Sequence, residues 1–252
     1  MTASSCTNKT INTLAEDCQS CILSSTCLPS AFNKNEIEKL QKIVSSGKQH
    51  LRQHTVYHQN SPFQALYIVK SGALKTYITD SNGHENITGF YLPGDITGLE
   101  SIAKGTYLST AEALTDSRLC KVHYQQLAEL RKSTPSLSDW AINLFSQSLA
   151  SGHEFFNCLS QHTAISKLAT FLLALSKRTS QSDNYQTTFL LSMSRQDIGN
   201  YLGLAYETTS RAFTRLVEKK CIQKKNKEIS IIDLEKLKQC STLNIMNDDE
   251  LA

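Results

Sequence analysis

The middle of the chain alternates short apolar segments with turn residues. The β-rich segments are residues 65–69, 73–78, 87–92 and 117–122. Turn-forming residues separate them, and the Asn-Gly pair within residues 80–83 tolerates the positive φ angles of a hairpin tip. Short strands at this spacing predict an antiparallel β-roll or jelly roll.

A helical pattern follows over residues 135–159, in which one set of positions recurs at steps of three and four. These positions are Ile142, Phe145, Leu149, Gly152, Phe156 and Leu159. The pattern is that of an a/d seam in a coiled coil, so it predicts a long dimerisation helix and a homodimer. The seam could instead pack on the chain's own roll, but its length favours self-association. Gly152 contributes no side chain and costs about 1 kcal/mol of helix stability relative to Ala.

Two short helices are predicted in the last third of the chain. Ser194, with Asp197 three residues later, indicates a helix start, and Gly203 ends that helix. A second helix follows within about three residues, and Gly199 is small where the two helices must cross. This arrangement predicts a helix-turn-helix. Residues 221–232 read as strand, turn and strand, which adds a wing.

The second helix of this motif carries residue types that read DNA bases. Its N-terminal end enters the major groove and holds Tyr206, Glu207, Ser210 and Arg211. Arg binds guanine edges, and Glu accepts a hydrogen bond from cytosine. We also expect DNA contacts from Arg195 on the first helix and from Lys225 in the wing, beside Lys224 and Lys227. The alternative to a DNA-reading motif is a pair of packed helices with a charged outer face.

Charge and composition limit the kinds of partner that the chain is expected to bind. Residues 164–240 contain 13 Lys and Arg against 7 Asp and Glu, whereas residues 1–163 contain 13 of each. A basic last third predicts a polyanionic partner, although a solvated basic face would look the same. The apolar run at residues 171–175 is too short to span a membrane, and the first ten residues carry no apolar signal segment. A cytoplasmic protein with no membrane partner is therefore expected.

Eight cysteines in a chain without an export signal predict reduced thiols or metal ligands. Three of them are close together in the sequence: Cys18, Cys21 and Cys27. They leave one ligand to be found elsewhere, and Cys120 is the candidate, with Cys158 and Cys6 as rivals. Four sulfur ligands suit either zinc or an iron–sulfur cluster. Three near cysteines and one distant one favour a cluster, while zinc and redox-active thiols remain alternatives.

Taken together, these features resemble the FNR-type (fumarate and nitrate reduction) oxygen-sensing regulators of the cyclic-AMP-receptor-protein superfamily. The most specific matches are the cysteine run followed by Leu28 and Pro29, residues 87–95, residues 197–203, and the Glu207, Ser210, Arg211 triplet. The resemblance implies an α+β fold with an N-terminal cysteine loop, an antiparallel β-roll sensor domain, a long dimerisation helix and a C-terminal winged helix-turn-helix.

We expect five segments along the chain. They are a cluster-binding segment at 1–35, the β-roll at 36–132, the dimerisation helix at 133–163, the winged helix-turn-helix at 164–240, and an acidic tail at 241–252.

The resemblance also implies a cofactor and partners. It implies an oxygen-labile [4Fe-4S] cluster, with Cys120 as its fourth ligand, that promotes dimerisation and binding to inverted repeats of TTGAT-type half-sites. It implies a contact to RNA polymerase, for which residues 79–85 are the candidate loop. The family's dimer helix often has an acidic residue at the position of Gly152, so this chain departs from the pattern there.

Two functions are excluded at this stage. Nucleotide-binding relatives carry Gly-Glu and Arg-Ser pairs where this chain has Gly98-Leu99 and Leu108-Ser109. Without that arginine a buried phosphate would lack its charge partner, so we expect no cyclic nucleotide. No Cys/His/Asp constellation or Gly-rich phosphate loop is apparent, so we do not expect an enzyme.

Overall fold

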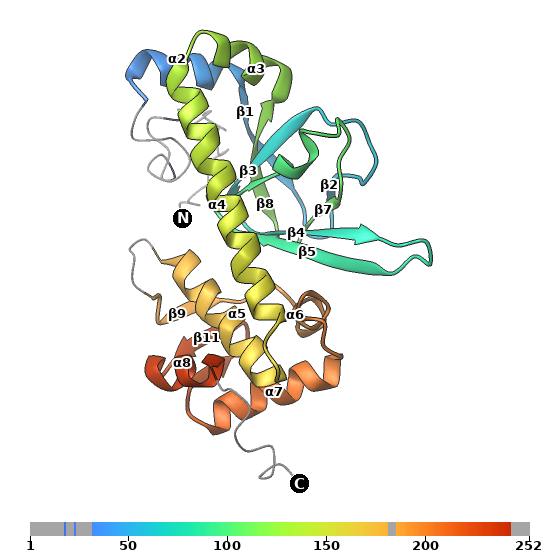
Figure 1. Cartoon of the computed structure of the whole chain (residues 1–252), viewed down its shortest axis with the longest axis vertical. Coiled ribbons are helices and arrows are strands. Elements are labelled where there is room, and N and C mark those ends of the chain that lie inside the picture. Colours follow the sequence, from blue (N-terminus) through green and yellow to red (C-terminus); the bar gives the residue numbers. More distant parts are fainter. Residues whose placement is uncertain (1–17, 19–22, 24–31, 181–184, 243–252) are drawn as a thin grey trace, which may run out of the picture.

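The computed structural model describes residues 18, 23, 32–180 and 185–242. A long helix, α4 (Pro135–Leu159), runs along the molecule and connects a β-roll to a helical C-terminal domain (Figure 1). Proline at its first position suits a helix start, because the missing N–H would have no helical partner there. Among the described residues, no helix is both long and apolar enough to cross a membrane.

The β-roll consists of two four-stranded antiparallel sheets. One has the order β1 (Val44–His50), β8 (Ser117–His123), β3 (Ala65–Ser71), β6 (Ile96–Thr97). The other has the order β2 (Thr55–Tyr57), β7 (Thr110–Ala113), β4 (Leu74–Thr79), β5 (Glu85–Tyr91). Val69, Leu74, Ala113 and Leu119 are buried together between them. This confirms the antiparallel roll.

Helices close one end of the roll. The helices α2 (Lys34–Ile43) and α3 (Tyr124–Lys132) meet the first turns of α4 around the buried side chains of Phe32, Leu40 and Leu137. Asn33 caps α2 through a reciprocal bond with Glu36. This packing fixes the N-terminal half of α4 beside the roll.

The C-terminal domain is a winged helix-turn-helix. Its helices are α5 (Ala164–Thr179), α6 (Arg195–Leu202), α7 (Tyr206–Glu218) and α8 (Leu234–Thr242). Its strands β9 (Thr188–Leu190), β10 (Ile222–Lys225) and β11 (Glu228–Ile231) form one sheet with β11 in the centre. The strand–turn–strand wing is present as predicted, and β9 adds a third strand to it.

The turn between α6 and α7 follows the local pattern of the sequence. Ser194 and Asp197 form a reciprocal capping box at the start of α6. Gly203 ends the helix in the left-handed conformation, with φ of 65°. A Cβ on Gly199 would lie 2.7 Å from Oγ1 of Thr209 and 2.9 Å from the carbonyl oxygen of Leu204. Only glycine therefore allows the two helices to cross this closely.

Candidate functional site

The helix α7 presents one face to solvent and one to the domain core. Tyr206 is 56% exposed, and Glu207 and Arg211 are exposed beside it. Ala212 and Phe213, on the opposite face, are almost completely buried. The side chains predicted to read bases thus lie at the N-terminal end of α7, free of the protein core.

Ser210 differs from its neighbours because it is engaged within the protein. It is half-buried, and its Oγ accepts a hydrogen bond from Nη1 of Arg195 on α6. The guanidinium of Arg195 also lies 5.3 Å from the ring centroid of Phe213, at cation–π distance. Arg195 is therefore held against α7 instead of extending freely into solvent.

The wing brings further positive charge to the same face. Lys224, Lys225 and Lys227 are exposed around the turn between β10 and β11. Nζ of Lys224 lies 6.0 Å from the centroid of the Phe213 ring, which Arg195 also approaches. Burial lowers the pKa of Lys224, and the charge of Arg195 adds to this effect. The start of α6, the exposed face of α7 and the wing thus form one cationic surface.

The apolar seam of α4 is largely exposed in the part of the single chain that the structure describes. Its four largest exposed members are Ile142 (66%), Phe145 (45%), Leu149 (64%) and Phe156 (74%). Gly152 is exposed and Leu159 is half-buried. Neither the roll nor the C-terminal domain covers the centre of this seam, which argues against internal packing.

Cys120 lies on the central strand β8, directly opposite Ile68 of β3. It is half-buried, and its neighbour Leu119 points into the roll, so Cys120 faces outward from the sheet. Leu66 is two residues from Ile68 and shares this outer face.

The other candidate ligands are only partly within the described residues. Cys18 is half-buried, whereas Cys21, Cys27 and Cys6 lie outside the described residues. The rival Cys158 is buried in the core cluster of the C-terminal domain, and its Sγ donates to the carbonyl oxygen of Lys167 at 3.2 Å. Burial raises the pKa of the Cys158 thiol to about 11. A buried, protonated thiol is a poor metal ligand, whereas the half-buried thiol of Cys120 suits one.

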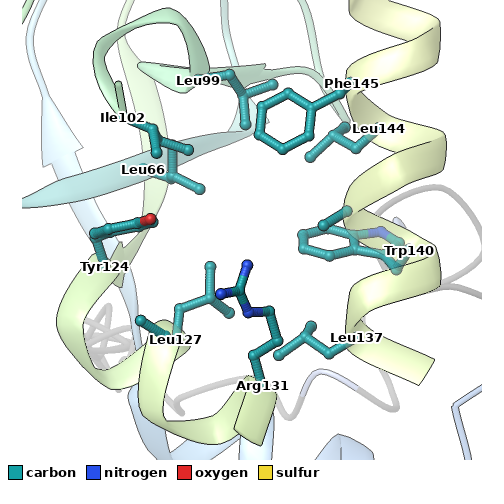
Figure 2. Close-up of a pocket in the computed structure, with 12 residues that line it drawn as sticks. Leu66, Leu99, Ile102, Tyr124, Leu127, Arg131, Leu137, Trp140, Leu144 and Phe145 are labelled. Carbon is teal, nitrogen blue, oxygen red and sulfur yellow. The ribbon is translucent and has the colours of Figure 1, made fainter. Parts of the chain in front are cut away.

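A cavity of about 120 Å³ separates the outer face of the roll from α4 (Figure 2). Its labelled lining residues are Leu66, Leu99, Ile102, Tyr124, Leu127, Arg131, Leu137, Trp140, Leu144 and Phe145. Arg131 extends from α3 toward the enclosed space. The cavity joins two features already described, because Leu66 shares the sheet face of Cys120 and Phe145 belongs to the seam.

Aromatic side chains fill part of the interior of the roll. The rings of Tyr57 and Tyr107 stack with centroids 3.9 Å apart. The hydroxyl of Tyr57 shares a 2.5 Å hydrogen bond with Thr97, and Ser109 donates to Oε1 of Glu100 at 3.1 Å. Burial raises the pKa of Tyr57 well above its ordinary value, and the nearby charge of Glu100 adds to this. The Tyr57 hydroxyl is therefore buried, whereas Glu100 is exposed and lies close enough for its charge to act on Tyr57.

Polar contacts connect the roll to α6, and sequence reasoning missed all of them. Nζ of Lys75 on β4 lies 3.5 Å from Asp197 and 3.6 Å from both Glu85 and Glu112. Burial alone would lower the pKa of Lys75, but the three carboxylates outweigh it and raise the pKa. Asn200 accepts from the backbone N–H of residue 87 and donates to the carbonyl oxygen of Glu85, each at 2.7 Å.

A second group of contacts lies beside the first. Arg178 on α5 donates to Oδ2 of Asp95 at 2.6 Å and to the carbonyl oxygen of Phe90 at 2.8 Å. The ring of Tyr201 on α6 stacks with Phe155 of α4 at 4.2 Å. The helices α5 and α6, on which α7 packs, are therefore oriented by contacts to both the roll and α4. No local sequence pattern reveals such pairs, because the partners are far apart along the chain.

Comparison with known proteins places these features in a class. Residues 48–134 match the cyclic nucleotide-binding domain family, and residues 166–240 match the Crp-like helix-turn-helix domain family. The structure of FixK2 from Bradyrhizobium japonicum superimposes with a TM-score of 0.71 at 27% identity, covering 79% of this chain and 99% of that one. The fold and the cationic surface define a DNA-binding transcription regulator.

Whole-chain relatives identify the family. The transcriptional regulatory protein btr of Bordetella pertussis is 38% identical over 225 residues, covering 89% of this chain and 93% of the relative. The fumarate and nitrate reduction regulatory protein of Escherichia coli K12 is 34% identical over 222 residues, covering 88% and 89%. The chain belongs to the CRP/FNR family of transcription regulators, and these relatives are regulators, not enzymes.

Proposed function

We propose that this protein is an oxygen-responsive transcription regulator that binds a [4Fe-4S] cluster through Cys18, Cys21, Cys27 and Cys120. The observation that carries the proposal is the position of Cys120 on the outer face of the roll. This face also holds Leu66, which lines the cavity against α4. A cluster needs four thiolates, and this chain offers three in one short run and a fourth on a rigid strand. When bound, the cluster supplies the oxygen-labile group.

The role of the protein is to connect ligand binding to the dimer seam. When the cysteine run is held against Cys120, it covers the outer face of the roll. This cover fixes how Leu66 packs beside the cavity next to α4. Phe145 lines the same cavity and belongs to the seam, so its orientation depends on that packing. Two copies of α4 then bury their exposed seams against one another in a homodimer.

The dimer positions two copies of α7 for DNA binding. Arg211 contacts the guanine of a TTGAT-type half-site and Glu207 the cytosine paired with it or beside it. Ser210, oriented by Arg195, contacts the neighbouring thymine, and Tyr206 lies at the edge of the same surface. Lys225 contacts phosphate from the wing. Two-fold symmetry of the dimer matches an inverted repeat of the half-site.

The interior of the roll supports regulation without a cyclic nucleotide. Stacked tyrosines occupy it, and the carboxylate of the exposed Glu100 lies beside Ser109. Leu108 and Ser109 stand where the Arg-Ser pair would meet a phosphate. A cyclic phosphate placed there would meet a carboxylate without a cation to pair with it. Calorimetry with cyclic AMP should show no binding heat, and micromolar binding would contradict the proposal.

The β4–β5 hairpin is the proposed contact to RNA polymerase in the cytoplasm. It projects from the roll (Figure 1), and residues 79–85 at its tip are exposed. Asp80 fixes the turn by accepting from the backbone N–H groups of Asn82 and His84. Asn82→Ala should lower transcription in vitro and leave DNA affinity unchanged. An unchanged transcript yield would refute this contact.

The test of the proposed function is the metal content of the protein. We expect protein purified without oxygen to be brown, to contain iron and acid-labile sulfide, and to bleach in air. A colourless protein with stoichiometric zinc, or one with neither metal, would instead support a zinc or thiol sensor of the same fold. Zinc added to the apoprotein is the matched control, because it should not restore oxygen-dependent behaviour.

A further inference from the structure

Two cysteines outside the proposed cluster site face each other in the C-terminal domain. The Sγ atoms of Cys221 and Cys240 lie 3.7 Å apart. Cys221 lies between α7 and the wing strand β10, and Cys240 lies on α8. Their side chains are enclosed, because the residues are only 1% and 5% exposed. A disulfide requires about 2.05 Å between the sulfurs, so a shift of less than 2 Å would join them.

The two thiols differ in how firmly the backbone holds them. The N–H of Cys221 donates to the carbonyl oxygen of Leu216 in α7, and its own carbonyl oxygen accepts from Ile232 and Asp233. Cys221 is therefore fixed where α7, the wing and the start of α8 meet. Cys240 lies near the end of α8, and helix ends open more readily than helix centres. Cys240 can therefore most easily make the movement of less than 2 Å that joins the two sulfurs.

We propose that Cys221 and Cys240 form a modification site at which hydroperoxides generate an intramolecular disulfide. The thiolate of Cys240 attacks one oxygen of hydrogen peroxide, which gives a sulfenic acid and, after proton transfer, one water. The sulfur of Cys221 then displaces hydroxide from that sulfenic acid, forming the S–S bond and, with the remaining proton, a second water. The two thiols lose two electrons and two protons in total, and the peroxide is reduced to two waters.

The environment of the pair selects for small oxidants and for this product. Burial raises the pKa of the Cys221 thiol to about 11, and the contact with Cys240 adds to this effect. Because Cys221 and Cys240 are only 1% and 5% exposed, large alkylating reagents should react slowly with the folded protein. A sulfenic acid on Cys240 has its resolving thiol already in contact, so disulfide formation should outpace oxidation to sulfinic acid.

The disulfide would close a loop that contains the whole wing. Closing this loop restricts the unfolded chain and so stabilises the C-terminal domain. The exposed face of α7 is opposite the buried face of this helix, whose Phe213 and Leu216 belong to the same core cluster as the cysteine pair. We therefore expect oxidation to stabilise the domain and to change DNA affinity less than threefold.

The experiment is a thiol map of the full chain. Reduced anaerobic protein is treated with hydrogen peroxide, quenched with an alkylating reagent in denaturant, digested and analysed by mass spectrometry. We expect a linked Cys221–Cys240 peptide, and a rise of roughly 5–10 °C in the unfolding midpoint of the C-terminal domain. The buried Cys158 is the internal control: peroxide should not oxidise it, so it should be recovered in its alkylated form.

Two outcomes would overturn the proposal. One is recovery of Cys221 and Cys240 as separate alkylated or sulfinic peptides after peroxide has oxidised the cysteines of the proposed cluster site. The other is linkage of either residue to a different cysteine. Cys158→Ser should give the same linked peptide as the natural chain, whereas Cys240→Ser should give none and no rise in midpoint. The map of the natural chain decides the question even if Cys240→Ser does not fold.

Discussion

Leu149→Glu tests whether the seam of α4 joins two chains. A fully buried leucine contributes about 1.5–3 kcal/mol relative to an exposed one. Because Leu149 is 64% exposed in the single chain, a dimer interface can add about two-thirds of that, roughly 1–2 kcal/mol per chain. Both copies lose this burial, so the dimer should weaken by roughly 2–4 kcal/mol, or about 30- to 1,000-fold in Kd. Desolvation and mutual repulsion of the two carboxylates weaken it further.

The assay is anaerobic sedimentation over a dilution series, with the visible spectrum recorded on the same sample. Gln147→Glu is the matched control, because Gln147 is exposed on α4 and lies off the seam. The control should sediment like the natural protein, while Leu149→Glu should sediment as a monomer with an unchanged spectrum. A Leu149→Glu protein whose dimer dissociates at the same concentration as the control would refute the role of the seam.

Four further substitutions test other parts of the account. Cys120→Ser should abolish the visible absorbance and iron content of anaerobic protein, and retention of both would assign the fourth ligand elsewhere. Arg211→Ala should cost roughly 1–3 kcal/mol of DNA-binding free energy per half-site and relax the preference for guanine. Lys225→Ala should instead weaken binding to all sequences about equally and reduce the slope of affinity against salt by about one. If Arg211→Ala lowered the affinity for every sequence equally, Arg211 would be a phosphate contact. Gly199→Ala should destabilise the C-terminal domain by about 1–3 kcal/mol in chemical unfolding, because its Cβ would meet Thr209, and an unchanged midpoint would show that the helices separate easily.

Local patterns account for the parts of the fold that the sequence predicts. The capping box of Ser194 and Asp197 and the left-handed Gly203 act within a few residues, so their sequence alone indicates the ends of α6. The hairpin at Asp80 is likewise determined by residues close together in the sequence. By contrast, β6 contains two residues and β2 three, which is too short for an alternating pattern to appear.

Contacts between distant residues escape such reasoning. The strand β1 is largely polar, and an irregularity between Ser45 and Lys48 breaks its pairing with β8, so it gives no strand pattern. The pairing of Lys75 with Asp197 joins residues 122 positions apart, and only the folded chain brings them together. For the same reason, the sequence predicts Arg195 as a DNA contact without indicating that it binds Ser210.

The central claim is that oxygen controls DNA binding through the cysteine site, and one titration tests it directly. Anaerobic protein is titrated against a fluorescent duplex carrying a TTGAT-type inverted repeat, air is admitted, and the titration is repeated on the same preparation. The account predicts that affinity falls at least tenfold as the visible absorbance bleaches, with no such change for Cys120→Ser. Equal affinity before and after bleaching would contradict the account.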